Sequence, residues 1–129
     1  MKLILYAFVG LIAIITFSSC EGNTRRTWEI TNSSSFKVEL TVDSLSQELL
    51  VNTIAPGATE TILITDTRGG NSNHGPITEW LEFTIQSGTS MLTKDPLNDS
   101  NWSVYSDQLS KVPSEYQHDF VFQFDDSDF

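Results

Sequence analysis

The sequence predicts an all-β domain, a single two-layer antiparallel β-sandwich with about six or seven strands. Apolar side chains recur at every second position in several short segments, as in strands with one buried face. Clusters of Gly, Pro, Asn and Ser separate these segments at short intervals. Because no stretch carries a convincing helical stripe, a second sheet is expected to cover the first.

An export signal precedes the domain. Lys2 supplies a positive start, residues 3–15 are apolar except for Gly10, and small residues follow. This apolar run is shorter than the ~20 residues that a membrane-spanning helix needs. Residues 1–19 are therefore predicted to be a signal peptide that is removed from the mature protein.

The end of this signal, Phe17-Ser18-Ser19-Cys20, resembles the bacterial lipobox, although Phe17 stands where Leu is usual. The resemblance implies cleavage between Ser19 and Cys20 and attachment of diacylglycerol to the Cys20 thiol. Cys20 is the only cysteine, so an internal disulfide is excluded. An uncleaved membrane span and a plain signal peptide remain alternatives.

The first strands follow a polar tether at residues 20–26, and the domain is expected to occupy residues 27–129. Residues 28–31 predict a weak strand, and residues 36–42 alternate apolar and polar side chains. Residues 49–54 predict another weak strand. In residues 61–65, Ile62 and Ile64 are expected to share one face, although Leu63 makes the other face apolar as well.

The second half of the domain predicts three further strands. Residues 80–85 are expected to bury Leu81, Phe83 and Ile85 and to place Trp80 on the polar side. Residues 102–106 predict a weak strand, and residues 103–112 are compatible with one short helical turn. Residues 119–124 predict a closing strand with three inward phenylalanines.

Turn chemistry marks the boundaries of these strands. Residues 32–35 separate the first two, and Pro56-Gly57 is the pair typical of a type II turn. Residues 67–76 predict a long polar loop, and residues 95–99 a further turn.

The arrangement resembles small lipoproteins of the Bacteroidota. The shared pieces are Asn32-Ser33-Ser34, Ile54-Ala55-Pro56-Gly57 and an aromatic closing strand, residues 116–124, that ends in acidic residues. The resemblance implies an immunoglobulin-like or related sandwich domain and carries over no catalytic residue. It also relates the triplet Asp43-Ser44-Leu45 to the O-glycosylation site of exported proteins, with Ser44 as the acceptor.

Net charge excludes one class of partner. Without Lys2 the chain retains six basic and 17 acidic residues, a net charge of −11. Nucleic-acid affinity comes largely from basic residues that neutralise phosphates, so nucleic acid is not expected as a partner. The same charge argues against attraction to anionic lipid surfaces.

The sequence contains no convincing catalytic or metal-binding pattern. His74 and His118 have no closely spaced metal-ligating partner, and the acidic residues 125–128 are expected to form a solvated tail rather than a calcium site. No cofactor and no enzymatic activity are expected. A small hydrolase that uses a Ser with His74 or His118 is the least favoured alternative.

Aromatic side chains give the remaining functional signal. Trp80, Trp102 and Tyr105 are candidate binding residues for a glycan or a protein, although both tryptophans could instead cap the core. The sequence thus predicts a membrane-anchored, non-catalytic binding or accessory lipoprotein of the bacterial outer membrane, on its periplasmic or outer side. A structural or envelope-assembly lipoprotein is the alternative.

Overall fold

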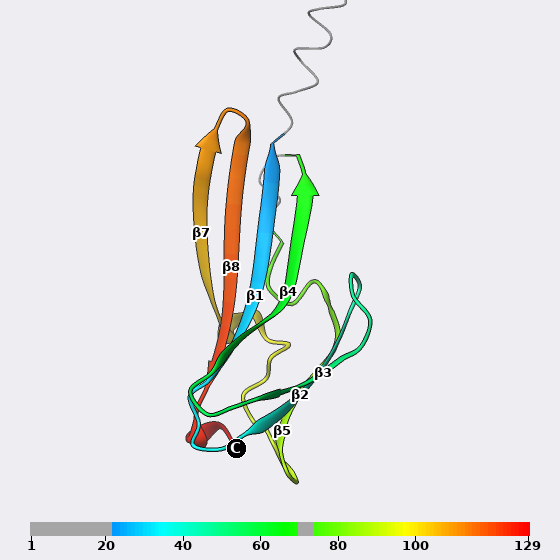
Figure 1. Ribbon diagram of the computed structural model, residues 1–129, viewed down its shortest axis with the longest axis vertical. Helices are drawn as coiled ribbons and strands as arrows, with labels where there is room; N and C mark the ends of the chain where they lie inside the picture. The colour runs from blue at the N-terminus through cyan, green and yellow to red at the C-terminus, as the bar shows by residue number, and fades with distance from the viewer. Residues whose placement is uncertain (1–21, 70–73) are drawn as a thin grey trace, which may run out of the picture.

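The computed structural model describes residues 22–69 and 74–129, which form a sandwich of two four-stranded sheets (Figure 1). The predicted all-β sandwich is confirmed. The signal peptide, its cleavage site at Ser19 and the proposed lipid-bearing Cys20 lie outside the described residues.

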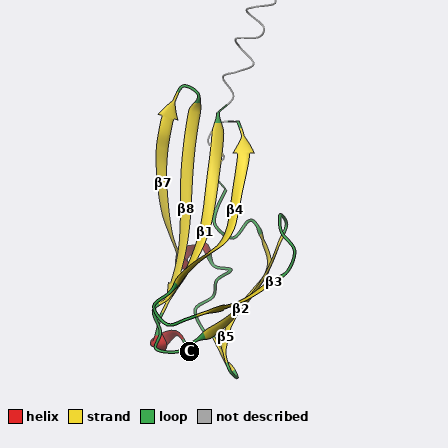
Figure 2. Cartoon of the chain, viewed as in Figure 1, coloured by secondary structure: helices red, strands yellow, loops and turns green. Residues whose placement is uncertain are grey.

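One sheet is long, and its strand order is β4-β1-β8-β7 (Figure 2). Its strands are β1 (Asn23–Asn32), β4 (Thr59–Arg68), β7 (Trp102–Lys111) and β8 (Ser114–Phe124). Strands β1 and β8 run parallel, whereas the other neighbours in this sheet are antiparallel. The first and last strands of the described chain thus pair side by side at the centre of the long sheet.

The short sheet has the order β3-β2-β5-β6 and covers one part of the long sheet. Its strands are β2 (Val38–Ser44), β3 (Leu50–Ile54), β5 (Trp80–Ser87) and β6 (Ser90–Met91). All of its pairs are antiparallel. The short 3-10 turn η1 (Asp99–Asn101) precedes β7, and a second one, η2 (Asp126–Asp128), follows β8.

The core between the sheets is rich in aromatic side chains. Trp28 is fully buried, and its ring packs against Phe120 at 5.0 Å and Trp80 at 5.9 Å between centroids. Phe83 contacts Trp80 and Trp102 edge to face. Burial of such large side chains, with ~1.5–3 kcal/mol for each, holds the two sheets together.

The predicted face of β5 is wrong at its first two residues. Leu81 is exposed and Trp80 is buried, whereas Phe83 and Ile85 face the core as expected. The register of β2 and β5 shifts between Asp43 and Ser44, so Ser44 pairs with Trp80 and Leu81 is the extra residue. A β-bulge of this kind reverses the side of each residue beyond it.

The predicted face of Ile64 in β4 is also wrong, because this strand contains a second bulge. Its register with β1 shifts between Trp28 and Glu29. As a result Ile62 and Leu63 are both buried, whereas Ile64 is exposed on the outer face. The apolar run that alternation could not place on one face therefore spans the bulge.

Two boundaries also differ from the expectations. The tether is shorter than predicted, because residues 23–26 already belong to β1 and pair with both β4 and β8. Residues 103–112 contain no helical turn, since β7 continues to Lys111.

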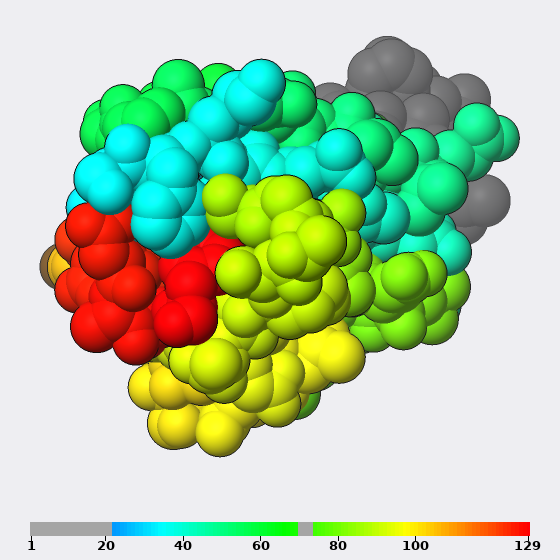
Figure 3. Space-filling model, turned by 90° about the horizontal axis from the view of Figure 1, so that it is seen from below, coloured from blue at the N-terminus to red at the C-terminus, as the bar shows by residue number. Residues whose placement is uncertain are grey.

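The C-terminal acidic residues are ordered rather than simply solvated. The carboxylate of Asp125 accepts a hydrogen bond from the Ser127 N–H, and the Asp128 carboxylate accepts one from the Asp125 N–H. Phe129 packs against Phe36 and Phe124. Seen from below in Figure 3, this red segment lies against the segments that precede β2 and follow β6.

The long sheet extends well beyond the short one (Figure 1). We call this part the projecting end: it comprises residues 22–26, 65–69 and 106–118, including the β7–β8 hairpin. There the inner face of the long sheet changes from apolar to polar, because the row after Trp28 and Phe120 contains Arg26 and His118.

Candidate functional site

The structure separates the three candidate binding aromatics. Trp80 and Trp102 are only 9% and 6% exposed, so the interpretation of these rings as surface binding residues is wrong. Both belong to the core, as the alternative held, and the Trp102 indole N–H donates to the Pro96 carbonyl at 2.8 Å. Tyr105 is 60% exposed and keeps its candidacy.

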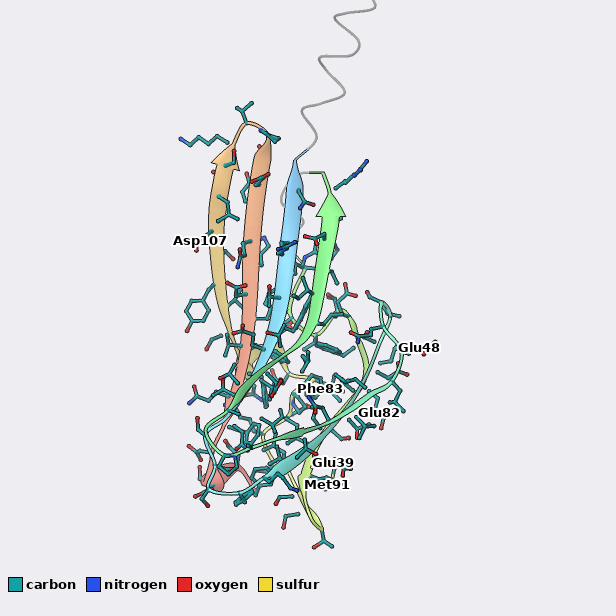
Figure 4. The ribbon with its side chains drawn as sticks, in the orientation of Figure 1. Glu39, Glu48, Glu82, Phe83, Met91 and Asp107 are labelled. Atoms are coloured by element: carbon teal, nitrogen blue, oxygen red, sulfur yellow. The ribbon has the colours of Figure 1, made fainter. Side chains whose placement is uncertain are left out.

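Tyr105 lies on the outer face of the long sheet, within cross-strand rows of polar side chains. Its neighbour on β8 is Asp119, and the next row towards the hairpin pairs Asp107 with Gln117. The Gln117 amide donates to both carboxylate oxygens of Asp119, at 3.0 and 3.1 Å. Asp107, labelled in Figure 4, lies on β7 at the edge of this sheet.

The row of Gln117 continues across the sheet to an ion pair. Arg25 on β1 is the neighbour of Gln117 and binds Asp66 on β4 through two contacts, at 3.0 and 3.2 Å. The hydrogen bond from Arg25 lowers the pKa of Asp66 below its usual value, so this carboxylate stays ionised near neutral pH. Both side chains are about half exposed and available to a ligand.

A groove of about 220 Å³ opens beside this ion pair. It is lined by Asn23, Arg25, Leu109, Glu115, Tyr116 and Gln117. We call the region formed by Tyr105, Asp107, Gln117 and Asp119 the Tyr105 face. It combines an exposed ring with amide and carboxylate groups, and the guanidinium group of Arg25 is the neighbour of Gln117 on β1.

A second polar cluster occupies the inner face of the projecting end. The Ser106 hydroxyl lies 2.7 Å from Nδ1 of His118, and Arg26 is the neighbour of His118 on β1. Arg26 donates to the Thr67 hydroxyl at 3.3 Å. Burial, reinforced by the positive charge of Arg26, lowers the pKa of His118 below its ordinary value.

This cluster contains a Ser–His pair but differs from a hydrolytic triad. In such triads a carboxylate bonded to the imidazole stabilises its protonated form. Here the neighbouring side chain on β1 is a cation, and Asp119 follows His118 on the opposite face of the strand. The cluster therefore favours a neutral imidazole and a structural role.

The surroundings of the other predicted site residues, Ser44 and His74, do not indicate a site. Ser44 is buried, and its hydroxyl donates to the Gln47 carbonyl and accepts from the Gln47 N–H. Attachment of a sugar to Ser44 would require this turn to open. His74 is exposed in the segment that leads into β5, and in residues 22–69 and 74–129 no cluster of three potential metal ligands occurs.

Comparisons of the chain with protein families, with curated proteins and with solved structures find no match. Within the described ranges, no helix is long and apolar enough to cross a membrane.

The Tyr105 face could be predicted only in part from the sequence. Alternation in residues 117–123 could have placed Gln117 and Asp119 on the outer face of β8, but their neighbours on β1 and β7 depend on the strand order.

Proposed function

We propose that the chain is a lipoprotein of the bacterial outer membrane, anchored through Cys20, whose sandwich is a non-catalytic module that binds a glycan. The observation that carries the proposal is the exposed ring of Tyr105 beside the hydrogen-bonded pair Gln117–Asp119. Aromatic rings offer a large apolar area at low entropic cost. Amide and carboxylate groups beside the ring suit the hydroxyls of a sugar, which both donate and accept hydrogen bonds.

The anchor is supported by sequence and by the start of the fold. The lipobox resemblance ends at Cys20, and β1 begins at Asn23. Only two residues therefore separate the acylated cysteine from the sheet. A single acyl chain binds a membrane only weakly and reversibly, whereas two or more chains anchor a protein stably. A cysteine that carries several acyl chains would therefore hold the domain firmly at the membrane surface.

Glycan binding is tested with the full-length protein purified from membranes in detergent and applied to an array of bacterial and host glycans. Replacement Tyr105→Ala should lower affinity for the bound glycan about tenfold, through loss of stacking on the ring. Val104→Ala is the matched control, because Val104 is also exposed but precedes Tyr105 on the opposite face of β7. Equal glycan affinity of Tyr105→Ala and the parent would refute the proposed site.

The alternative, a structural lipoprotein that packs against a larger assembly, is favoured by the short sheet. Its outer side exposes Val51, Leu81 and Met91 among carboxylates such as Glu39 and Glu82 (Figure 4). Crosslinking in intact cells should then recover one abundant protein partner. Recovery should be lost in Leu81→Lys, a change that leaves the Tyr105 face untouched.

A further inference from the structure

We infer that the projecting end of the long sheet rests on the lipid bilayer, with the tip of the β7–β8 hairpin in the headgroup region. This inference rests on the proposed lipidation of Cys20. It adds a contact between the folded domain and the membrane, which a flexible tether would not require.

The position of the anchor follows from Gly22. Its backbone lies against Ser114 at the start of β8, and its carbonyl accepts a hydrogen bond from the Gly69 N–H at 2.8 Å. Two residues of chain span at most about 7 Å, which limits how far from Gly22 a lipid attached to Cys20 could be held. A lipid on Cys20 would therefore hold the bilayer surface close to the hairpin tip.

The hairpin tip exposes apolar side chains at this location. Val112 is 80% exposed and Leu109 is 61% exposed, and Pro113 between the two strands is also exposed. None of the three belongs to the hydrophobic core or packs against it. Apolar side chains that lie in the interfacial region of a bilayer gain free energy in proportion to their buried area.

Charge is distributed along the long axis of the domain. The projecting end contains four basic residues (Arg25, Arg26, Arg68 and Lys111) and three acidic residues (Asp66, Asp107 and Glu115), a net charge of +1. The rest of the described chain contains two basic and 13 acidic residues, a net charge of −11. The net charge of the whole chain argues against contact with anionic lipids. The projecting end taken alone is slightly positive, so this end can lie against them.

These observations favour a lipid bilayer as the partner that the hairpin tip contacts. Lys111 at the tip and Arg68 at the end of β4 are exposed, and their positive charges suit lipid phosphates. The acidic end is kept away from the same surface. Tyr105 lies six positions before Lys111 on β7, about 20 Å at 3.3 Å per residue, so the Tyr105 ring stands clear of the headgroups.

The test uses the full-length lipoprotein in vesicles of phosphatidylethanolamine and phosphatidylglycerol in equal amounts. Cys20 is the only cysteine, and its thiol is blocked once it carries the lipid. A thiol-reactive fluorophore therefore labels only a cysteine introduced elsewhere. An environment-sensitive fluorophore at Val112→Cys should emit at shorter wavelength on reconstitution and be quenched by spin-labelled lipid. The same probe at Thr89→Cys, in the exposed β5–β6 turn at the far end, should show neither change.

Vesicle flotation and the mass of the N-terminal peptide are measured on the same samples. If the protein floats and carries its acyl chains but the probe at position 112 behaves like that at position 89, the inference is wrong while the lipid anchor stands. If acyl chains are absent, the proposed anchor itself fails. Lys111→Glu should reduce quenching at position 112 about fivefold, whereas Lys37→Glu, outside the projecting end, should leave it unchanged.

Discussion

Gly22 lies so close to the carbonyl oxygen of Ser114 that a Cβ at position 22 would overlap it. This contact joins the residue before β1 to the first residue of β8, the two central strands of the long sheet. The parallel pair β1–β8 then runs from this point to Asn32 and Phe124 at the opposite end. The contact thus fixes where the chain enters the domain.

Replacement Gly22→Ala should destabilise the domain by about 1–3 kcal/mol, because the added methyl group meets backbone that cannot move aside. The control is Gly75→Ala, because the atoms nearest to its Cβ, from 3.1 Å, belong to the Asp99 carboxylate, the end of a side chain. Urea unfolding of both variants measures the difference. Equal stabilities would show that the start of β1 does not pack on β8 in this way.

The three tryptophans should respond differently to replacement by phenylalanine. The indole N–H of Trp28 donates to the Pro76 carbonyl, and that of Trp102 donates to the Pro96 carbonyl, both at 2.8 Å. Among the described residues the Trp80 indole N–H has no acceptor. Trp28→Phe and Trp102→Phe should each cost about 1–3 kcal/mol more than Trp80→Phe, since a buried carbonyl loses its donor.

Thermal unfolding of the three variants checks this order. A larger loss for Trp80→Phe than for the other two would contradict the assigned hydrogen bonds.

The bulge in β4 predicts opposite outcomes for two similar residues. Ile62→Ala should lower the free energy of unfolding by about 2–5 kcal/mol, since it removes buried methyl groups from the core. Ile64→Ala should change it by about 0.5 kcal/mol or less, because Ile64 is exposed. Denaturant titration of the pair measures both values. Similar losses would mean that β4 has a regular register.

Protonation of His118 should reduce stability at mildly acidic pH. Its pKa in the folded protein is lowered from 6.5 by burial and by Arg26, so the unfolded chain binds the proton first as pH falls below that value. The free energy of unfolding should therefore decrease from pH 6.5 downward. The lowered pKa values of Asp66 and Asp125 act only below about pH 4.

His118→Gln separates these contributions. Its unfolding free energy should vary less between pH 7 and about pH 5 than that of the parent protein, with the same loss below about pH 4. An unchanged slope in the upper range would assign the effect to other groups.

Much of the fold follows from alternation. The inward residues of β2 and the three phenylalanines of β8 lie on the predicted faces, because both segments keep a regular period of two. Trp80 and Ile64 were misplaced because each lies beside a bulge, and a bulge depends on the partner strand rather than on the local sequence. The early start of β1 has the same origin, since its polar residues 23–26 form a strand only between β4 and β8.

The candidate site was less predictable than the fold. Tyr105 was identified as a candidate from its residue type alone, and the same signal also selected the two buried tryptophans. Arg25 and Asp66 are 41 positions apart in the sequence, and nothing local indicates that they meet. Their pairing requires the order β4-β1-β8-β7, which periodicity does not specify.

The central claim is that a lipid on Cys20 holds this domain at a membrane. It is tested most directly by intact mass spectrometry of the mature protein purified from membranes, with fragmentation of its first peptide. The account predicts a chain that begins at Cys20 and carries diacylglycerol on the sulfur. A mature chain that begins elsewhere, or a Cys20 with an unmodified thiol, would contradict it.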